Sequence, residues 1–212
     1  MTNRYDTSAN PEGQYQPGSD DRVLVNLLGI TSVEDMDDAE LGRLANMQAA
    51  LLNEIEFDQR ITTDDLCAWH KRWLGDVYGW AGKYRTVNLQ KDGFMFAASN
   101  LIPKLMREYE SKYLTQYTPC NGFDAERLTE ALAICHVELI VIHPFREGNG
   151  RLARVLATIM ALQAGMPLLD FTYMTEHKDE YIAAIHAGHG GDYEPMKRMF
   201  AIILETSQNE AR

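Results

Sequence analysis

Between residues 126 and 163 the sequence shows two apolar helical patterns separated by a short polar segment. The first pattern recurs at three- and four-residue steps: Leu128, Leu132, Cys135, Leu139 and Ile142. The second has the same spacing: Leu152, Val155, Leu156, Ile159 and Met160. This is the period of one helix face. Because both faces need burial, the chain is predicted to place two helices (126–142 and 150–163) in its core and to hold the intervening loop between them.

That loop and the start of the second helix carry residues of the kinds found at phosphate sites. They are His143, Glu147, Gly148, Asn149, Gly150, Arg151 and Arg154. The first backbone N–H groups of a helix have no intrahelical partner and the helix dipole adds positive potential, so a helix start can bind an anion. Gly148 and Gly150 are expected to adopt left-handed conformations and to let the backbone approach a ligand. Asn149 adds a side-chain amide.

The charged residues of the segment extend this interpretation to a polyphosphate. Arg151 and Arg154 are three residues apart, so they share a helix face and can grip phosphate oxygens. Glu147 would repel that ligand unless a cation such as Mg²⁺ stood between them. His143 is then a candidate general base. Each residue alone has an ordinary structural explanation, a core histidine or a solvated helix face. The combination in this order is what points to a site.

Residues 143–154 resemble the signature of the Fic family, His-x-Phe-x-Asp/Glu-Gly-Asn-Gly-Arg-x-x-Arg, and fill every fixed position of it. The resemblance, which extends from about Tyr15 to Phe200, implies an all-α fold, the mainly helical Fic fold with one small β-hairpin flap. It also implies transfer of AMP from ATP to a Ser, Thr or Tyr hydroxyl of a target protein, with release of pyrophosphate.

The family roles transfer to this chain position by position. By resemblance, His143 takes the proton of the target hydroxyl and Glu147 holds Mg²⁺ across the α- and β-phosphates. The anion hole is formed by Gly148, Asn149 and Gly150, and the outer phosphates are held by Arg151 and Arg154. The Doc branch, which phosphorylates, has Ala-Asn-Lys in place of Gly-Asn-Gly, so nucleotidyl transfer is favoured. The alternatives are transfer or removal of another phosphate-linked group, and a non-catalytic Fic-like binding module.

A change of period between residues 86 and 96 predicts a β-hairpin. Thr86 to Gln90 alternates, Asp92-Gly93 is a strong turn signal, and Phe94 begins a return strand. By resemblance this hairpin is the flap that docks the target, with these residues: Asn88, Leu89, Gln90, Lys91, Asp92, Gly93 and Phe94. Its exposed edge could pair with an extended target segment. On periodicity alone, an ordinary hairpin packed on helices is the simpler interpretation.

The rest of the chain predicts one domain preceded by a tail. Residues 1–20 are polar and are interpreted as a tail, and residues 21–212 as a single Fic domain. Further helices are expected at about 33–57, from Thr62 onward, 100–117 with Asn100 as cap, 176–187 and 192–206. His70 is interpreted as a satisfied core histidine. A metal site of His186 and His189 is conceivable, but a solvated helix end is preferred.

Composition limits the partners and the compartment. The formal net charge of −11 argues against a nucleic-acid footprint, whereas a local arginine cluster suffices for ATP. The three cysteines are scattered, which favours reduced thiols. Neither a membrane-spanning run nor a signal peptide is apparent. We therefore expect a bacterial cytoplasmic protein without a membrane partner, although secretion as an effector leaves no such trace.

Fic enzymes are commonly restrained by a helix bearing Ser/Thr-x-x-x-Glu-Gly/Asn, whose glutamate pairs with the second signature arginine, here Arg154. Three segments approach that pattern: Ser8 to Gly13, Thr172 to Glu176 and Thr206 to Glu210. Pro11 disfavours a helix in the first, and the other two lack the final Gly or Asn. The hypothesis is a stand-alone Fic toxin held by a small antitoxin that supplies the glutamate. Related toxins suggest type II topoisomerase subunits as targets.

Overall fold

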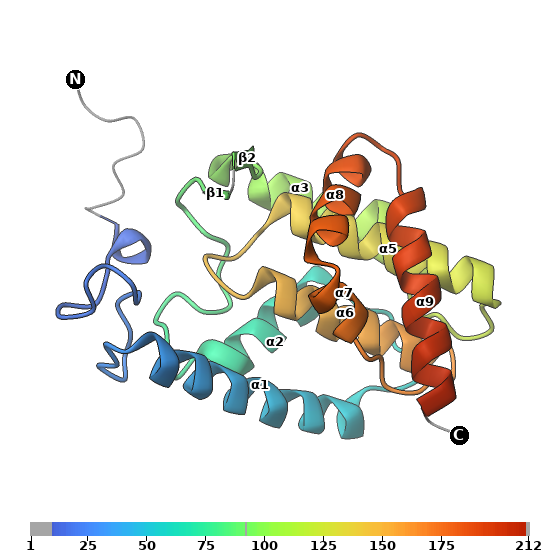
Figure 1. Ribbon diagram of the computed structural model, residues 1–212, viewed down its shortest axis with the longest axis horizontal. Helices are drawn as coiled ribbons and strands as arrows, with labels where there is room; N and C mark the ends of the chain where they lie inside the picture. Colours follow the sequence, from blue (N-terminus) through green and yellow to red (C-terminus); the bar gives the residue numbers. More distant parts are fainter. Residues whose placement is uncertain (1–9, 92, 211–212) are drawn as a thin grey trace.

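The computed structural model describes residues 10–91 and 93–210 (Figure 1), and helices dominate this part of the chain. In order, its helices are η1 (Pro11–Gly13), α1 (Val33–Glu54), α2 (Thr63–Leu74), η2 (Ser99–Leu101), α3 (Ile102–Tyr109), η3 (Glu110–Leu114), α4 (Thr115–Tyr117), α5 (Ala125–Ile142), α6 (Asn149–Gln163), α7 (Thr172–Glu176), α8 (Lys178–His189) and α9 (Glu194–Glu210). The only sheet in the described part pairs β1 (Gln90–Lys91) with β2 (Phe94–Met95). The predicted fold class, mainly helical with one small hairpin, is confirmed.

The two central helices, α5 and α6, form the core, as their apolar patterns predict. Both are buried along most of their length. In Figure 1, α1 and α2 lie on one side of α6, whereas α5, α8 and α9 lie on the other. Phe145, in the loop that joins α5 to α6, is fully buried. Phe145 therefore anchors the polar loop in the core, and the polar residues of the loop remain accessible.

Local capping sets the start of the N-terminal helices. The Ser32 side chain accepts a hydrogen bond from Asp35 N (3.4 Å) at the start of α1. At α2, Thr62 and Asp65 form a capping box: the side chain of each residue accepts a hydrogen bond from the backbone N–H of the other. Both starts agree with the sequence expectation, whereas α1 ends at Glu54, three residues before the expected end.

The expected helix at 100–117 is not continuous. Asn100 lies in the 3₁₀ turn η2 and makes no capping bond, and the α-helix begins at Ile102 because Pro103, which has no N–H, fits only a first turn. A π-helical segment, η3, then interrupts the α geometry. Its first residue, Glu110, accepts hydrogen bonds from Thr63 N (2.7 Å) and Oγ1 (2.6 Å), so a side chain distant in sequence contacts the first turn of α2.

The expected helix at 176–187 corresponds to α8, which begins and ends two residues later than expected, and a second, short helix precedes it. The shorter one, α7, starts at Thr172 because Asp170 Oδ1 accepts from Thr172 N (2.9 Å) and Oγ1 (2.7 Å). The longer one, α8, then runs to His189. The short helix α7 was not predicted, because it starts from this side-chain turn at Asp170 and hydrophobic periodicity does not indicate it.

The hairpin is shorter than the alternation predicts. Its ladder pairs only Gln90 with Met95 and Lys91 with Phe94. Outside it, Asn88 Oδ1 accepts from Ser99 N (2.9 Å), which takes this part of the chain out of the ladder. Asp92, the first turn residue of the prediction, lies outside the described residues.

Part of the expected N-terminal tail contacts the folded body. Asn10 Nδ2 donates to Thr86 Oγ1 (2.7 Å), and Glu12 Oε2 accepts from Thr86 N (2.8 Å). The Glu12 carbonyl also accepts from Arg146 Nε (2.7 Å). The domain boundary at residue 20 stays a prediction, and residues 1–9 lie outside the described part. Within residues 10–91 and 93–210, no helix combines the length and apolar character needed to cross a membrane.

Candidate active site

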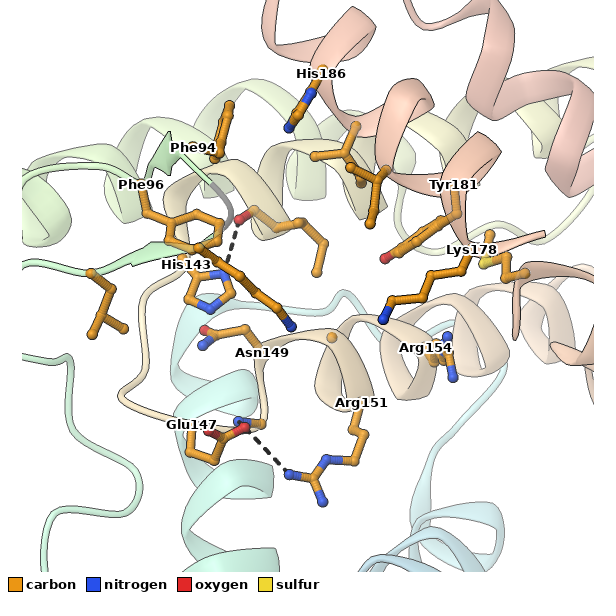
Figure 2. Close-up of a pocket in the computed structure, with 18 of the residues that line it drawn as sticks. Phe94, Phe96, His143, Glu147, Asn149, Arg151, Arg154, Lys178, Tyr181 and His186 are labelled. Atoms are coloured by element: carbon orange, nitrogen blue, oxygen red, sulfur yellow. Dashed lines mark hydrogen bonds and ion pairs between the residues drawn. The ribbon is translucent and has the colours of Figure 1, made fainter. Parts of the chain in front are cut away.

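A cleft of about 700 Å³ opens between the hairpin, the α5–α6 loop, α6 and α8 (Figure 2). All seven signature residues predicted for the site line it: His143, Glu147, Gly148, Asn149, Gly150, Arg151 and Arg154. Four residues of the predicted flap also line it: Leu89, Gln90, Lys91 and Phe94. Asn88 and Gly93 are not among the lining residues. Tertiary structure therefore gathers the predicted catalytic, phosphate and flap residues around one space.

His143 ends α5 in a left-handed conformation (φ 52°), which turns the chain sharply toward the cleft. Its Nδ1 lies 3.1 Å from the carbonyl of Ile140, and a carbonyl can only accept, so Nδ1 carries the proton. The lone pair is then on Nε2. Phe96 stacks on the ring, with centroids 3.7 Å apart. Burial lowers the pKa of His143 to about 4, so the ring is neutral at pH 7 and able to accept a proton.

Arg85 joins the hairpin to this histidine. Its guanidinium, 1% exposed, donates to the carbonyls of His143 (2.7 Å), Val87 (2.6 Å) and Ala97 (2.6 Å). It also reaches the Ile142 carbonyl at 3.3 Å. The same side chain therefore holds both ends of the flap segment and the strained backbone of His143. The sequence did not reveal this role of Arg85, because its acceptors are carbonyls that have no signature in the sequence.

Gly148 and Asn149 shape the start of α6. Gly148 has φ 81°, and a Cβ atom there would lie 2.6 Å from Cζ3 of Trp73. The Asn149 side chain is occupied at both ends, because Oδ1 accepts from Phe145 N (2.9 Å) and Nδ2 donates to Phe145 O (2.8 Å). The predicted side-chain amide of Asn149 therefore closes the loop through one of its two N–H groups.

The other predicted loop glycine is helical. Gly150 lies in α6 and has no positive φ, so the expectation of a left-handed conformation was wrong there. The helix begins one residue earlier than expected. Its N-terminal backbone hydrogen bond, in which Leu152 N donates to Gly148 O four residues earlier, has a length of 2.9 Å. The preceding N–H groups at 149–151 therefore form the unpaired helix end that an anion can bind.

One carboxylate oxygen of Glu147 is engaged and the other is available. Oε1 accepts from Gly148 N (2.9 Å) and lies 3.5 Å from Arg151 Nη2, while Oε2 accepts no hydrogen bond from the residues that the structure describes. No group of three His, Cys, Asp or Glu within the described chain could hold a metal ion. A metal at Glu147 would complete its coordination with phosphate oxygens and water. Mg²⁺ is commonly held in this way, so the residue fits the predicted ion.

His70 positions the Glu147 backbone from the core. Its Nδ1 accepts from Gly82 N (2.8 Å), so Nε2 carries the proton and donates to Glu147 O (3.1 Å). The ring also stacks on Phe145, with centroids 4.0 Å apart. Burial lowers the pKa of His70 to about 4. The prediction of a satisfied core histidine is confirmed, and the structure adds that this histidine supports the loop.

The two signature arginines have different surroundings. Arg151 Nη2 lies 2.6 Å from Glu40 Oε2, and its guanidinium packs over Trp73 at 4.7 Å from the ring centroid. Figure 2 shows the same side chain reaching toward Glu147. The Arg154 guanidinium lies 5.6 Å from the centroid of Phe171, and its buried Nε has no hydrogen-bond partner. No carboxylate of residues 10–91 or 93–210 forms an ion pair with Arg154.

The helix α8 was expected from the sequence, but its residues were not assigned to the site. Lys178 and Tyr181 project from α8 into the cleft, opposite Arg154 (Figure 2). The Tyr181 hydroxyl lies 2.8 Å from Nε2 of the buried His136. Lys178, Tyr181, Ile182 and Ile185 form a helical stripe, which could have indicated a face but not which space it borders.

The cleft is basic although the protein is acidic. Among the described lining residues, five side chains are basic, namely Lys91, Arg146, Arg151, Arg154 and Lys178, whereas Glu147 is the single acidic one. The whole chain carries a formal net charge of −11. This local reversal of sign favours a polyanionic small molecule over a nucleic acid, which would need a broad basic face.

Comparison with known proteins relates this chain to the Fic/DOC family and to protein adenylyltransferases. The family model Fic/DOC family matches residues 60–161. Protein adenylyltransferase VbhT of Bartonella schoenbuchensis is 32% identical over 156 residues, which are 73% of this chain and 32% of that protein. A probable protein adenylyltransferase Fic of Salmonella typhimurium is 30% identical over 151 residues, which are 68% of this chain and 71% of that protein. This chain spans about a third of the length of several such relatives.

Among solved structures, the BepC protein of Bartonella tribocorum with bound AMPPNP superposes with a TM-score of 0.73 and covers 91% of this chain and 96% of that one. Its sequence identity is 23%, so this likeness establishes the fold. The fold, the signature residues gathered in one cleft and the two relatives agree: the chain belongs to the Fic/DOC family.

Proposed function

We propose that this chain is a protein adenylyltransferase, which transfers AMP from ATP to a Ser, Thr or Tyr hydroxyl of another protein. The observation that carries the proposal is the position of His143. Its neutral ring, protonated on Nδ1, lies on the same cleft as the unpaired start of α6 and the basic side chains. VbhT and the Salmonella relative, both named adenylyltransferases, support the same activity.

The proposed reaction uses these groups in order. His143 Nε2 accepts the proton of the target hydroxyl while the oxygen attacks the α-phosphorus of ATP. A phosphorus–oxygen bond forms to the target and the bond to the β-phosphate oxygen breaks, which releases pyrophosphate. The N–H groups at the start of α6, together with Arg151 and Arg154, bind the phosphates and offset the charge that develops on them.

Glu147 is the residue that would hold Mg²⁺, since its Oε2 is free of other partners in the described chain. The ion would neutralise negative charge on the α- and β-phosphates and thereby favour departure of pyrophosphate. His70 and Gly148 N keep Glu147 in place by contacting its carbonyl and its Oε1, respectively.

The hairpin supports a docking role for the target. Leu89, Gln90, Lys91 and Phe94 line the cleft, and Arg85 ties the base of the hairpin to His143. A target segment that paired with a hairpin edge would be registered by backbone hydrogen bonds. Phe94 stacks on His186 (centroids 4.9 Å apart), which fixes the end of the hairpin against α8.

Regulation in trans is part of the proposal. Of the three segments that approach the inhibitory pattern, the first contains Pro11–Gly13, a 3₁₀ turn whose Glu12 contacts Thr86 and Arg146 instead of Arg154. Arg154 therefore remains open to a glutamate from a small antitoxin, which would make this chain the toxin of a pair in the bacterial cytoplasm. Type II topoisomerase subunits are the first targets to assay.

Radiolabelled ATP tests the activity directly. The purified chain is incubated with Mg²⁺, bacterial lysate or gyrase subunits, and ATP labelled on either the α- or the γ-phosphate. We expect α-label on a target protein and none with His143→Ala. Transfer of γ-label would indicate kinase chemistry, and equal α-labelling by His143→Ala would refute the assigned base. Adding a peptide with the inhibitory pattern should suppress the labelling if inhibition acts through Arg154.

A further inference from the structure

A buried carboxylate from outside the signature reaches the candidate site. Glu40 lies in the middle of α1 and is 3% exposed. Its Oε1 accepts from the Tyr78 hydroxyl (2.7 Å), and its Oε2 forms an ion pair with Arg151 Nη2 (2.6 Å). The Glu40 carbonyl accepts from Trp73 Nε1 (2.8 Å). Residue 40 precedes the part matched by the family model, 60–161, so the signature match does not cover this contact.

Arg151 lies between two carboxylates, and the distances show which one dominates. Its Nη2 is 2.6 Å from Glu40 but 3.5 Å from Glu147. The Glu40 side chain is 4% exposed, whereas that of Glu147 is 46% exposed. Charge interactions strengthen as water is excluded, and solvated pairs contribute little. Arg151 is therefore held chiefly by its ion pair with Glu40, and its interaction with Glu147 is the weaker of the two.

The consequence concerns the residue proposed to bind the metal. A carboxylate that is closely paired with a guanidinium has its oxygens and its charge already occupied, and so is a poor ligand for a cation. In this structure Arg151 Nη2 makes a short ion pair with Glu40 (2.6 Å) and only a long contact with Glu147 Oε1 (3.5 Å), and Glu147 Oε2 accepts no hydrogen bond from the described residues. Trp73 below the guanidinium limits its movement further.

We infer that Glu40 is a positioning residue for a divalent-metal nucleotide site: it limits Arg151 to a long contact with Glu147 and so keeps the Glu147 carboxylate available to the metal ion. The inference deepens the proposed function and rests on it for the nucleotide. It predicts that loss of the Glu40 charge redirects Arg151 to its nearest remaining carboxylate, Glu147. Metal binding then weakens although no metal ligand has been changed.

The test measures binding without turnover. In a His143→Ala background, isothermal titration with a non-hydrolysable ATP analogue is performed with and without Mg²⁺, and the ratio of the two affinities is compared between variants. Glu40→Gln keeps an acceptor for Tyr78 and should lower this ratio about tenfold, at the lower end of the effect of residues that orient metal ligands. Asp38→Asn, an exposed charge loss in the same helix, should leave it unchanged.

A second variant separates positioning from general loss of structure. Glu40→Gln combined with Arg151→Gln removes the competing guanidinium, so the Mg²⁺ ratio should return toward the wild-type value even if nucleotide binding as a whole is weaker. Far-UV circular dichroism verifies that each variant is folded. A merely structural role of Glu40 would lower the melting temperature and leave the ratio unchanged in both variants.

Each outcome bears on the inference. A tenfold loss in Glu40→Gln with recovery in the double variant supports it. An unchanged ratio overturns it, as does a raised ratio with tighter nucleotide binding, which would make Glu40 a brake instead. If the wild-type chain transfers AMP but Glu40→Gln shows no such loss, the inference alone fails. If Mg²⁺-dependent binding follows the expected pattern without AMP transfer, the proposed function alone fails. A wild-type chain that binds no Mg²⁺-nucleotide refutes the inference.

Discussion

Substituting Gly148 by Ala tests the conformation of the signature loop. Gly148 has φ 81° and ψ 4°, a left-handed conformation that costs a residue with a Cβ atom about 1–2 kcal/mol. The new methyl group would lie 2.6 Å and 2.8 Å from Cζ3 and Cη2 of Trp73. Trp73 is 0% exposed, so its ring cannot move aside without disturbing its neighbours. Overpacking of this kind typically costs about 1–3 kcal/mol.

The two costs add to roughly 2–5 kcal/mol of unfolding free energy for Gly148→Ala. For a chain of this length, that corresponds to a fall in melting temperature on the order of 4–20 °C. Urea denaturation at a fixed protein concentration, followed by circular dichroism, measures the free energy directly.

Gly150→Ala is the matched control, because it makes the same chemical change two residues away. A Cβ atom at Gly150 would have no neighbour within 4 Å, and the residue lies in α6 without a positive φ. Ala is favoured over Gly in a helix, so Gly150→Ala should be as stable as the wild type or more stable, by up to about 1 kcal/mol. The reasoning is refuted if the free energy of unfolding of Gly148→Ala lies within ~0.5 kcal/mol of the wild-type value. It is also refuted if Gly150→Ala loses as much unfolding free energy as Gly148→Ala.

Four further changes test the site. His143→Ala should lower the rate of AMP transfer ~10²–10⁴-fold. In the wild type, that rate should rise as the pH increases through about 4, because only the deprotonated ring can act as a base. The pKa of His70 is also lowered in the folded protein, from its ordinary 6.5 to about 4. The contribution of His70 to the free energy of unfolding is therefore complete above pH 6.5 and should decrease by up to ~3 kcal/mol as the pH falls toward 4. Urea denaturation at several pH values should show a smaller decrease for His70→Gln. Arg85→Lys leaves at least one of four carbonyls unpaired and should cost ~1–3 kcal/mol, and it should reduce transfer to a protein more than ATP binding, as kinetics with each substrate varied would show. Arg154→Ala should weaken ATP binding measured by calorimetry more than it changes the urea midpoint, and equal losses in both would contradict a phosphate contact.

Local patterns in the sequence predicted the central architecture. The three- and four-residue spacing placed α5 and α6, and the segment from Thr62 onward marked the start of α2, where the structure shows a capping box. Both depend on residues within one or two turns of each other, so their physical causes are contained in a short window. The signature loop was likewise recognisable, because its residues are contiguous in the chain.

Features that depend on particular side-chain hydrogen bonds could not be predicted in this way. The start of α7 and the short hairpin ladder depend on side-chain hydrogen bonds that compete with regular structure. The Asn149 amide was assigned to the ligand, yet in the folded loop it closes on Phe145.

The sequence by itself determined which residues make the loop a phosphate-binding candidate, because helix period and signature order are local properties. Only the tertiary structure decided how those residues are held. Arg151 is paired with Glu40, 111 positions earlier, and Arg85 binds carbonyls of two separate segments. Such contacts require the helices to be packed before the partners meet, and no spacing along the chain records them.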